Sequence, residues 1–282
     1  MVNNHNPHPT TAREACNAKR EGATPYAGGT DFMVRHALAV RTGKCPSLIF
    51  LDGVKDFHGI STTDETVRIG ALTTMAELSI HAVIPKLLRV ACNCVGSPAL
   101  RNVATLGGNV CTASPAGDSL PALYVLGAQV EICSPEGNRF MPICNFIKGP
   151  GRTALEADEL LSAVILPTTE FNKFYHRKVS PRVANAITKV SLAVTATMKS
   201  NRVENIRIAY GSVGPTIIDC PEIEAACIGL SVAELAAKTP ELMTMVETTV
   251  KPIDDHRSSA QYRRSIAANL LAECIKKITS TP

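Results

Sequence analysis

Ala27-Gly28-Gly29-Thr30-Asp31 and Ala104-Thr105-Leu106-Gly107-Gly108-Asn109 form two glycine turns in this sequence. Each turn borders an extended or apolar segment and carries a threonine. Glycine accepts positive φ values and lets a ligand approach the main chain, so two such loops can close on one extended anion. Threonine hydroxyls, and a helix following the first turn, would add further donors to the phosphate oxygens of a dinucleotide.

Neither turn matches the signature of a known phosphate-binding fold by itself. The pattern is not G-x-G-x-x-G, nor G-x-x-x-x-G-K-[ST], so the sequence supports neither a Rossmann domain nor a P-loop. Taken alone, each turn is a weak signal, and the first is more typical of an ordinary Gly-Gly loop. The nearby carboxylates of Asp31 and Asp118 would repel a pyrophosphate, so they are expected to accept a hydrogen bond from a ribose hydroxyl or to cap a helix.

Composition limits the classes of protein that this chain can be. It has 282 residues, 45% of them hydrophobic, which suffices for two or three small domains. The formal charge of +4 comes from 29 basic and 25 acidic residues without a basic block, which argues against a nucleic-acid surface. Residues 1–9 lack the apolar core of a secretion signal and no run is long enough for a membrane span, so we expect a cytoplasmic chain.

Cysteine usage predicts neither disulfides nor a metal site. The ten cysteines include no C-x-x-C pair, and in a chain of this size without a signal they are typical of reduced, mostly buried thiols. Cys92 and Cys94 are spaced C-x-C, which fits alternate positions on a half-buried segment better than metal ligation.

Capping boxes and hydrophobic patterns predict an α+β protein. The boxes Thr11–Glu14, Thr74–Glu77 and Ser231–Glu234 each predict the start of a helix. Other helices are expected at 32–40, 84–95, 120–126, 223–228 and 258–278, and strands at 47–51, 67–71, 128–133, 139–143 and 158–166. A hairpin of 187–198 and 203–212 turns at Ser200-Asn201, which favours a separate carboxy-terminal domain of antiparallel strands and helices.

Residues 96–118 are expected to form a long irregular segment. Long connections without secondary structure are uncommon inside compact domains and are often functional. We therefore expect the binding site there.

Four segments resemble one family of flavoproteins. They are Tyr26-Ala-Gly-Gly-Thr-Asp-Phe32, Ile69-Gly-Ala-Leu-Thr73, Arg101-Asn-Val-Ala-Thr-Leu-Gly-Gly-Asn-Val-Cys-Thr-Ala-Ser-Pro-Ala-Gly-Asp118 and Ala209-Tyr-Gly-Ser-Val-Gly-Pro-Thr216. Together they resemble the FAD-binding medium subunit of the molybdenum hydroxylases, the family of xanthine, carbon monoxide and nicotinate dehydrogenases. The resemblance covers nearly the whole chain, in order.

The resemblance implies a fold and a domain organisation. The fold would be the two-subdomain FAD-binding fold of the vanillyl-alcohol oxidase and p-cresol methylhydroxylase type, followed by an antiparallel-sheet-and-helices domain of the CO dehydrogenase flavoprotein type. The expected divisions are FAD-binding subdomain 1 at 1–56, FAD-binding subdomain 2 at 57–170 and the carboxy-terminal domain at 171–282.

The resemblance also implies the cofactor-binding residues. Both glycine turns would hold the FAD pyrophosphate, Asp118 would contact the adenosine or ribose side, and Lys178 would approach the cofactor. Lys178 lies in the basic stretch 175–182, which is also typical of a solvated loop. The full expected set is Thr24, Pro25, Tyr26, Ala27, Gly28, Gly29, Thr30, Asp31, Val95, Ala104, Thr105, Leu106, Gly107, Gly108, Asn109, Asp118, Leu160 and Lys178.

The implied function is electron transfer within a larger oxidoreductase. A large subunit would carry the molybdenum cofactor, a small subunit would carry [2Fe-2S] clusters, and FAD on this chain would pass electrons to NAD or another acceptor. No residue of this chain would act as an acid or base. The alternatives are a stand-alone flavin-dependent reductase of the same fold and a structural subunit that has lost FAD.

Overall fold

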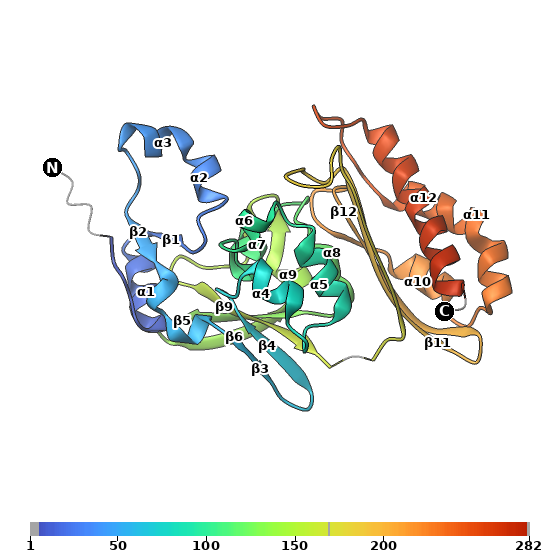
Figure 1. Cartoon of the computed structure of the whole chain (residues 1–282), viewed down its shortest axis with the longest axis horizontal. Helices are drawn as coiled ribbons and strands as arrows, with labels where there is room; N and C mark the ends of the chain where they lie inside the picture. The colour runs from blue at the N-terminus through green and yellow to red at the C-terminus, as the bar shows by residue number, and fades with distance from the viewer. Residues whose placement is uncertain (1–5, 169, 281–282) are drawn as a thin grey trace. The chain divides into compact units, whose positions relative to one another are not determined.

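The computed structural model describes residues 6–168 and 170–280 (Figure 1). The first five residues of the stretch used to judge a secretion signal lie outside this range. Contacts divide the chain into two compact units. Unit 1 consists of the described parts of Met1–Ile84, Ser97–Ala113 and Ala128–Pro167, and unit 2 of those of Pro85–Gly96, Ser114–Gly127 and Thr168–Pro282.

Unit 1 begins with a helix packed on two parallel strands. Helix α1 (Ala12–Arg20) precedes β1 (Thr24–Tyr26), which pairs in parallel with β2 (Leu48–Phe50). Cys16 and Ile49 are fully buried in the small core between them. The connection from β1 to β2 contains α2 (Phe32–Arg35) and α3 (Ala37–Thr42), so the single helix expected at 32–40 is interrupted at His36, whose φ of −106° and ψ of 20° lie outside the helical range.

The rest of unit 1 is built on a five-stranded antiparallel sheet. Its strand order is β3 (Ile60–Thr62), β4 (Thr66–Gly70), β9 (Leu160–Pro167), β5 (Gln129–Ser134) and β6 (Gly137–Pro142). The central strand, β9, is buried along most of its length. The remaining elements are η1 (Leu51–Gly53), η2 (Lys55–Phe57), α4 (Met75–Ile80), α6 (Pro98–Arg101), α7 (Leu106–Thr112), α9 (Ile143–Phe146), β7 (Ile147–Gly149) and β8 (Arg152–Thr153).

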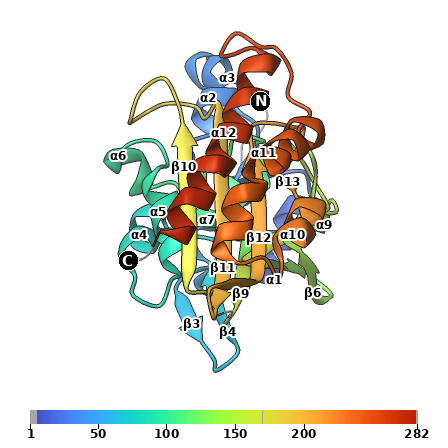
Figure 2. The ribbon, with the colours of Figure 1, turned by 90° about the vertical axis from the view of Figure 1, so that its right-hand side faces the viewer.

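Unit 2 is a three-layer arrangement around a second antiparallel sheet. The strand order is β10 (Lys173–Val179), β11 (Val190–Lys199), β12 (Arg202–Gly211) and β13 (Ile218–Asp219). Figure 2 shows α11 (Val232–Thr249) and α12 (Ala260–Thr279) lying over these strands. The same layer contains α10 (Pro221–Cys227), and α5 (Lys86–Asn93) and α8 (Leu120–Val125) contact the opposite face.

Local sequence signals account for many element ends. The predicted capping boxes are confirmed, with Thr11, Thr74 and Ser231 each accepting a hydrogen bond from the main chain of the glutamate three residues later. The predicted hairpin is confirmed as β11 and β12. Its turn residues Ser200 and Asn201 have φ of 48° and 61°, the pair of positive values that a two-residue type I′ turn requires.

Two sequence-based expectations were wrong. Residues 96–118 are not a long irregular segment, because they contain α6 and α7, which are capped by the Ser97 and Thr105 side chains. The basic stretch at 175–182 is not a solvated loop throughout, because its first five residues belong to β10. There Tyr175 is buried against the helical layer, while Lys178 lies on the other face of the sheet.

Two further sequence expectations concern membrane segments and thiols. Within the part of the chain that the structure describes, no helix is long and apolar enough to cross a membrane. Six of the ten cysteines are buried free thiols, and Cys144 alone is exposed.

The core of unit 2 yields a prediction about stability. Leu242 on α11 is fully buried, whereas Leu38 on α3 is 73% exposed. Leu242→Ala should lower the free energy of unfolding by about 2–5 kcal/mol, because it leaves a cavity among close-packed side chains. Leu38→Ala should cost under about 0.5 kcal/mol. Urea denaturation of both variants measures the difference, and equal losses would contradict the assignment of Leu242 to the core.

Candidate functional site

The first glycine turn lies between β1 and α2 and is pressed against the chain just before the second turn. A Cβ atom on Gly28 would overlap the main-chain carbonyl of Val103 and lie 3.2 Å from the Cα atom of Ala104. Gly29 has a φ of 69°, and a Cβ atom there would overlap the ring of Tyr26. Both positions therefore require glycine, and unit 1 brings the two predicted turns together.

Three main-chain amides of the first turn have no acceptor in the part of the chain that the structure describes. Among the described residues, no hydrogen bond is formed by the N–H groups of Gly28, Gly29 and Thr30. These residues are partly exposed, so water can solvate the amides when no ligand is bound. Three successive donors on a main chain without bulky side chains form a group that a phosphate oxygen can accept from.

The amides of the second turn are used by the protein itself. Five of the turn's six N–H groups donate inside unit 1, with donor–acceptor distances of 2.8–3.1 Å: Ala104 to the Leu100 carbonyl, Leu106 to the Thr73 carbonyl, Gly107 to the Ala71 carbonyl, Gly108 to Thr105 Oγ1 and Asn109 to the Thr105 carbonyl. Thr105 thus acts as the N-cap of α7. The hydrogen bonds of the second turn thus fix the start of α7, whereas the first turn leaves the amides of Gly28, Gly29 and Thr30 available to a ligand.

The two glycines of the second turn have different surroundings. A Cβ atom on Gly107 would lie 2.6 Å from Ala71 Cβ and 2.8 Å from the Ala71 carbonyl oxygen, so Gly107 is needed for packing. A Cβ atom on Gly108 would meet only Thr105 Oγ1, at 2.9 Å. A side chain at position 108 would therefore press on the cap hydroxyl alone, whereas one at position 107 would press on the main chain of Ala71.

Other predicted site residues of unit 1 have structural partners. Thr24, Pro25 and Tyr26 form β1, whose Tyr26 ring packs edge-on against Phe32. Asp31 pairs with Arg35 at 2.6 Å instead of capping α2 with its side chain. The helix that follows the first turn has only four residues, so it adds little of the helix dipole expected from the sequence.

Leu160 offers a ligand only its main chain. Its side chain is 4% exposed and packs in the core with Cys16 and Cys133. Its carbonyl oxygen accepts a hydrogen bond from the Cys133 thiol at 3.5 Å.

Asp118 and Lys178 form an ion pair inside unit 2. The Nζ atom of Lys178 lies 2.7 Å from Asp118 Oδ2 and donates to the Cys94 carbonyl at 2.9 Å. The two side chains are only 11% and 7% exposed. Burial raises the pKa of Asp118 above its usual value, while Lys178 and a hydrogen bond from Thr188 oppose the rise. Val95 follows Cys94 in the same segment, just beyond the end of α5.

Thr188 is a partner of Asp118 that sequence reasoning missed. Its hydroxyl donates to Asp118 Oδ1 at 2.6 Å, although the two residues are seventy positions apart. Nothing in a single sequence pairs a threonine with a carboxylate at that separation.

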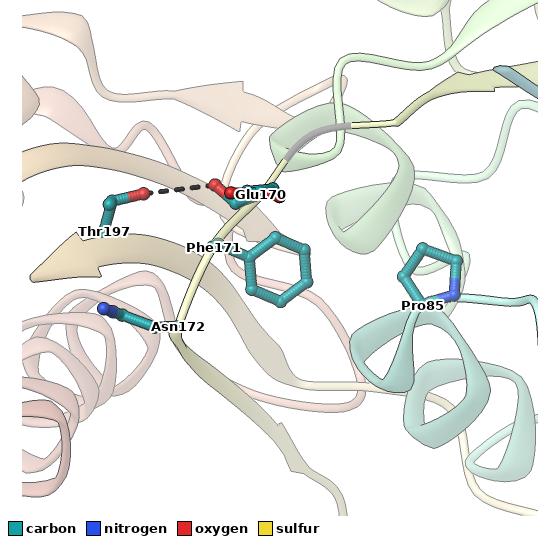
Figure 3. Close-up of a pocket in the computed structure, with 5 residues that line it drawn as sticks. All are labelled: Pro85, Glu170, Phe171, Asn172 and Thr197. Atoms are coloured by element: carbon teal, nitrogen blue, oxygen red, sulfur yellow. Dashed lines mark hydrogen bonds between the residues drawn. The ribbon is translucent and has the colours of Figure 1, made fainter. Parts of the chain in front are cut away.

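A shallow pocket elsewhere in unit 2 contains none of the predicted residues. Figure 3 shows its lining, which comprises Pro85, Glu170, Phe171, Asn172 and Thr197. The Thr197 hydroxyl donates to the Glu170 carbonyl at 3.2 Å, and Asn172 exchanges two hydrogen bonds with the main chain of Met198. Its polar groups thus largely satisfy one another, so the glycine turns remain the better candidate.

Comparison with family models assigns both parts of the chain. The model described as the FAD binding domain in molybdopterin dehydrogenase matches residues 6–169. The model described as the CO dehydrogenase flavoprotein C-terminal domain matches residues 175–278.

Relatives and solved structures agree with these matches. The xanthine dehydrogenase FAD-binding subunit of Escherichia coli O157:H7 is 30% identical over 261 residues, 90% of this chain and 86% of that protein. The nicotinate dehydrogenase FAD-subunit of Eubacterium barkeri is 35% identical and covers 84% of this chain and 82% of its own. A chain of carbon monoxide dehydrogenase from Hydrogenophaga pseudoflava is 23% identical, superposes with a TM-score of 0.89 and covers 98% of both chains. The predicted fold is confirmed.

The surroundings of Gly107 and Gly108 predict opposite sensitivities. Gly107→Ala should lower the free energy of unfolding by about 1–3 kcal/mol, because the added methyl group would overlap Ala71. Gly108→Ala should change it by less than about 1 kcal/mol, because alanine suits a helix and only the cap hydroxyl must adjust. Thermal and urea unfolding of the ligand-free variants test this order, and a reversed order would contradict the packing described above.

Proposed function

This chain belongs to the family of FAD-binding domains of molybdopterin dehydrogenases, and we propose that it is the electron-transfer subunit of a multi-subunit molybdenum hydroxylase. As the FAD-binding component of an oxidoreductase of the xanthine and carbon monoxide dehydrogenase type, it would take electrons from [2Fe-2S] clusters on a small subunit. It would pass them to NAD or another acceptor, while the molybdenum cofactor on a large subunit carries out the substrate chemistry. A cytoplasmic location is part of the same proposal.

The residues of unit 1 fit a dinucleotide. The observation that carries the proposal is the row of three unpaired amides at Gly28, Gly29 and Thr30, which lies against the segment that leads into the second turn. A pyrophosphate is an extended anion that needs several main-chain donors at close range, and only glycine allows that approach. The hydroxyls of Thr30 and Thr105 add further polar groups to these amides, and Gly108 places no side chain beside Thr105.

The proposed cofactor-binding set extends beyond these residues. In unit 1 it comprises Thr24 to Asp31, Ala104 to Asn109 and the main chain of Leu160. In unit 2 it comprises Val95, Asp118 and Lys178. The pyrophosphate contacts are supported by the free amides, and the contacts of unit 2 are supported by the exceptional pairing of a nearly buried carboxylate with a nearly buried ammonium group.

The chain's own chemical task in this proposal is to bind and orient. FAD supplies the exchange of single electrons and of electron pairs that a junction between iron–sulfur clusters and a hydride acceptor needs. The amides of the first turn fix its anionic centre, and Lys178 supplies a positive charge held by Asp118. The proposal assigns no residue of this chain as an acid or base.

Placing a branched side chain at Gly108 should remove the cofactor. Gly108→Val places an isopropyl group beside the cap of α7, so the purified variant should lose FAD and its yellow colour while remaining folded. Absorbance in the flavin bands and circular dichroism measure the two properties. Ala237→Val, which enlarges an exposed alanine on α11, is the matched control and should retain flavin. Full flavin content in Gly108→Val would contradict a ligand at the second turn.

The proposed partners should accompany the chain from its native source. Affinity purification of the tagged full-length chain should recover two further polypeptides, and elemental analysis should find molybdenum and an excess of iron over flavin. A yellow protein that purifies alone and reduces a substrate of its own would favour the stand-alone reductase. A colourless protein with partners would favour a structural subunit.

A further inference from the structure

The carboxylate of Asp118 is held at both of its oxygens. Oδ2 accepts from Lys178 Nζ at 2.7 Å, and Oδ1 accepts from the Thr188 hydroxyl at 2.6 Å. Thr188 is only 1% exposed and lies in the connection between β10 and β11. With a donor on each oxygen, the carboxylate has one preferred orientation, and each oxygen keeps a lone pair for another donor.

Ser212 connects the segments that carry Thr188 and Asp118. Its amide donates to the Pro115 carbonyl at 2.8 Å, in the same loop as Asp118 and three residues before it. Its hydroxyl donates to the Thr188 carbonyl at 3.1 Å. Its own carbonyl accepts from the buried guanidinium of Arg263 on α12 at 2.9 Å. The amide and the hydroxyl of Ser212 thus join the two segments, and its carbonyl anchors them to α12.

The segment around Ser212 is held in an unfavourable conformation. Ser212 has a φ of 64°, a left-handed value that is strained for a non-glycine residue. At Gly211, a Cβ atom would overlap Ser191 Oγ and lie 3.1 Å from the side chain of Pro121. The end of β12 is therefore pressed onto the segment that contains Asp118. Strain of this kind clusters at functional sites, because the surrounding structure has to enforce it.

Ser212 belongs to the segment 209–216, one of the four that resemble the flavoprotein family, and the cofactor-binding set proposed above contains no residue of this segment. We propose that Thr188 and Ser212 are positioning residues for FAD: Ser212 aligns Thr188 with the Asp118 loop, and Thr188 orients the Asp118 carboxylate toward the cofactor hydroxyls. This inference rests on the proposed function, specifically on contact between Asp118 and FAD. Thr188 and Ser212 need not touch the cofactor themselves.

Removing the Thr188 hydroxyl leaves Asp118 Oδ1 without its donor. In a nearly buried carboxylate this loss allows rotation, and it removes a hydrogen bond that stabilises the charged form. The retained partner, Lys178, has three N–H donors and uses two of them, on Asp118 and on the Cys94 carbonyl. Lys178 holds Oδ2 alone, so it cannot fix the orientation of Oδ1.

Protonation of Asp118 should also make FAD binding depend on pH. Burial already raises the pKa of Asp118, and the hydrogen bond from Thr188 opposes the rise. Only the ionised carboxylate accepts from hydroxyls at both oxygens, so FAD affinity should fall as the pH drops through this pKa. Without the Thr188 hydroxyl the pKa rises further, and the fall should begin at a higher pH. Among the described residues, the titratable groups near the pair include the thiols of Cys92 and Cys94 and the imidazole of His176 on β10, which stays neutral because burial and Lys178 lower its pKa to about 4.

The test compares Thr188→Val with Thr188→Ser in the full-length chain. Fluorescence titration with FAD at several pH values gives the dissociation constant, and thermal unfolding without FAD reports stability. Thr188→Val should weaken FAD binding about tenfold and move the acid-side loss of affinity to a higher pH. Thr188→Ser keeps the hydroxyl and should bind within about twofold of the parent chain with an unchanged pH profile.

Further variants separate this inference from the proposed function. Unchanged FAD binding in Asp118→Asn would remove the contact on which the inference rests, while Gly108→Val would still test the FAD site. Weakened binding in Asp118→Asn together with parental binding in Thr188→Val would overturn the positioning role alone. Equal weakening in both Thr188 variants, or a pH profile that does not move, would also overturn it.

Ser212→Gly keeps the test decisive if Thr188→Val does not fold. Glycine relieves the left-handed backbone but removes the CH2OH side chain and its hydrogen bond to the Thr188 carbonyl, so the ligand-free chain should unfold close to the parental temperature. The inference predicts severalfold weaker FAD binding despite this stability. Parental affinity in Ser212→Gly would overturn the role of Ser212.

Discussion

The close approach of Gly28 to the Val103 carbonyl is the contact on which the candidate site of unit 1 depends. It leaves no room for a side chain at position 28. It also brings the turn after β1 against the segment that leads into α7, although the two are far apart in sequence. Gly107 makes a similar close contact, because its main chain lies against Ala71, the residue that follows β4. A series of main-chain contacts, each permitted by a missing Cβ atom, therefore joins three segments.

This packing explains why the two turns have different tasks. The amides of Leu106 and Gly107 donate to the carbonyls of Thr73 and Ala71 and hold the start of α7 against the segment that follows β4. These two amides are therefore not available to a ligand. The first turn makes its contact through the Cα side of Gly28, which leaves its N–H groups unpaired. If the amides of both turns were hydrogen-bonded within the protein, no main-chain donors would remain for an anion. If both sets were unpaired, the hydrogen bonds that hold the start of α7 in place would be lost.

Features set by neighbouring residues were predictable from sequence, and features set by distant residues were not. The capping boxes at Thr11, Thr74 and Ser231 and the turn at Ser200-Asn201 depend on side chains within three residues, so they were predicted. Helix α7 was missed because two glycines lower helix propensity. Its cap and the packing of Gly107 on Ala71 override that propensity.

The same distinction applies to the candidate site. Both glycine turns were identified from their local pattern, but which amides stay free depends on the partners that tertiary structure provides. Strand β10 was missed because its basic residues, Arg177 and Lys178, indicate a solvated loop. Lys178 lies in the sheet because Asp118 and the Cys94 carbonyl, both distant in sequence, compensate its charge and its donors.

The nearly buried ion pair of Asp118 and Lys178 is weak evidence that the pair stabilises the fold and better evidence for a ligand-binding site. Desolvating two charges costs several kcal/mol per ion, and the attraction between them repays that cost only when further hydrogen bonds complete the geometry. Here those bonds come from Thr188 and the Cys94 carbonyl, and Thr188 is in turn held by the strained Ser212. A core built for stability alone would gain from apolar side chains at these positions. The third N–H donor of Lys178 and the remaining lone pairs of Asp118 can pair with water or with a ligand, and a dinucleotide rich in hydroxyls and acceptors has the groups to do so.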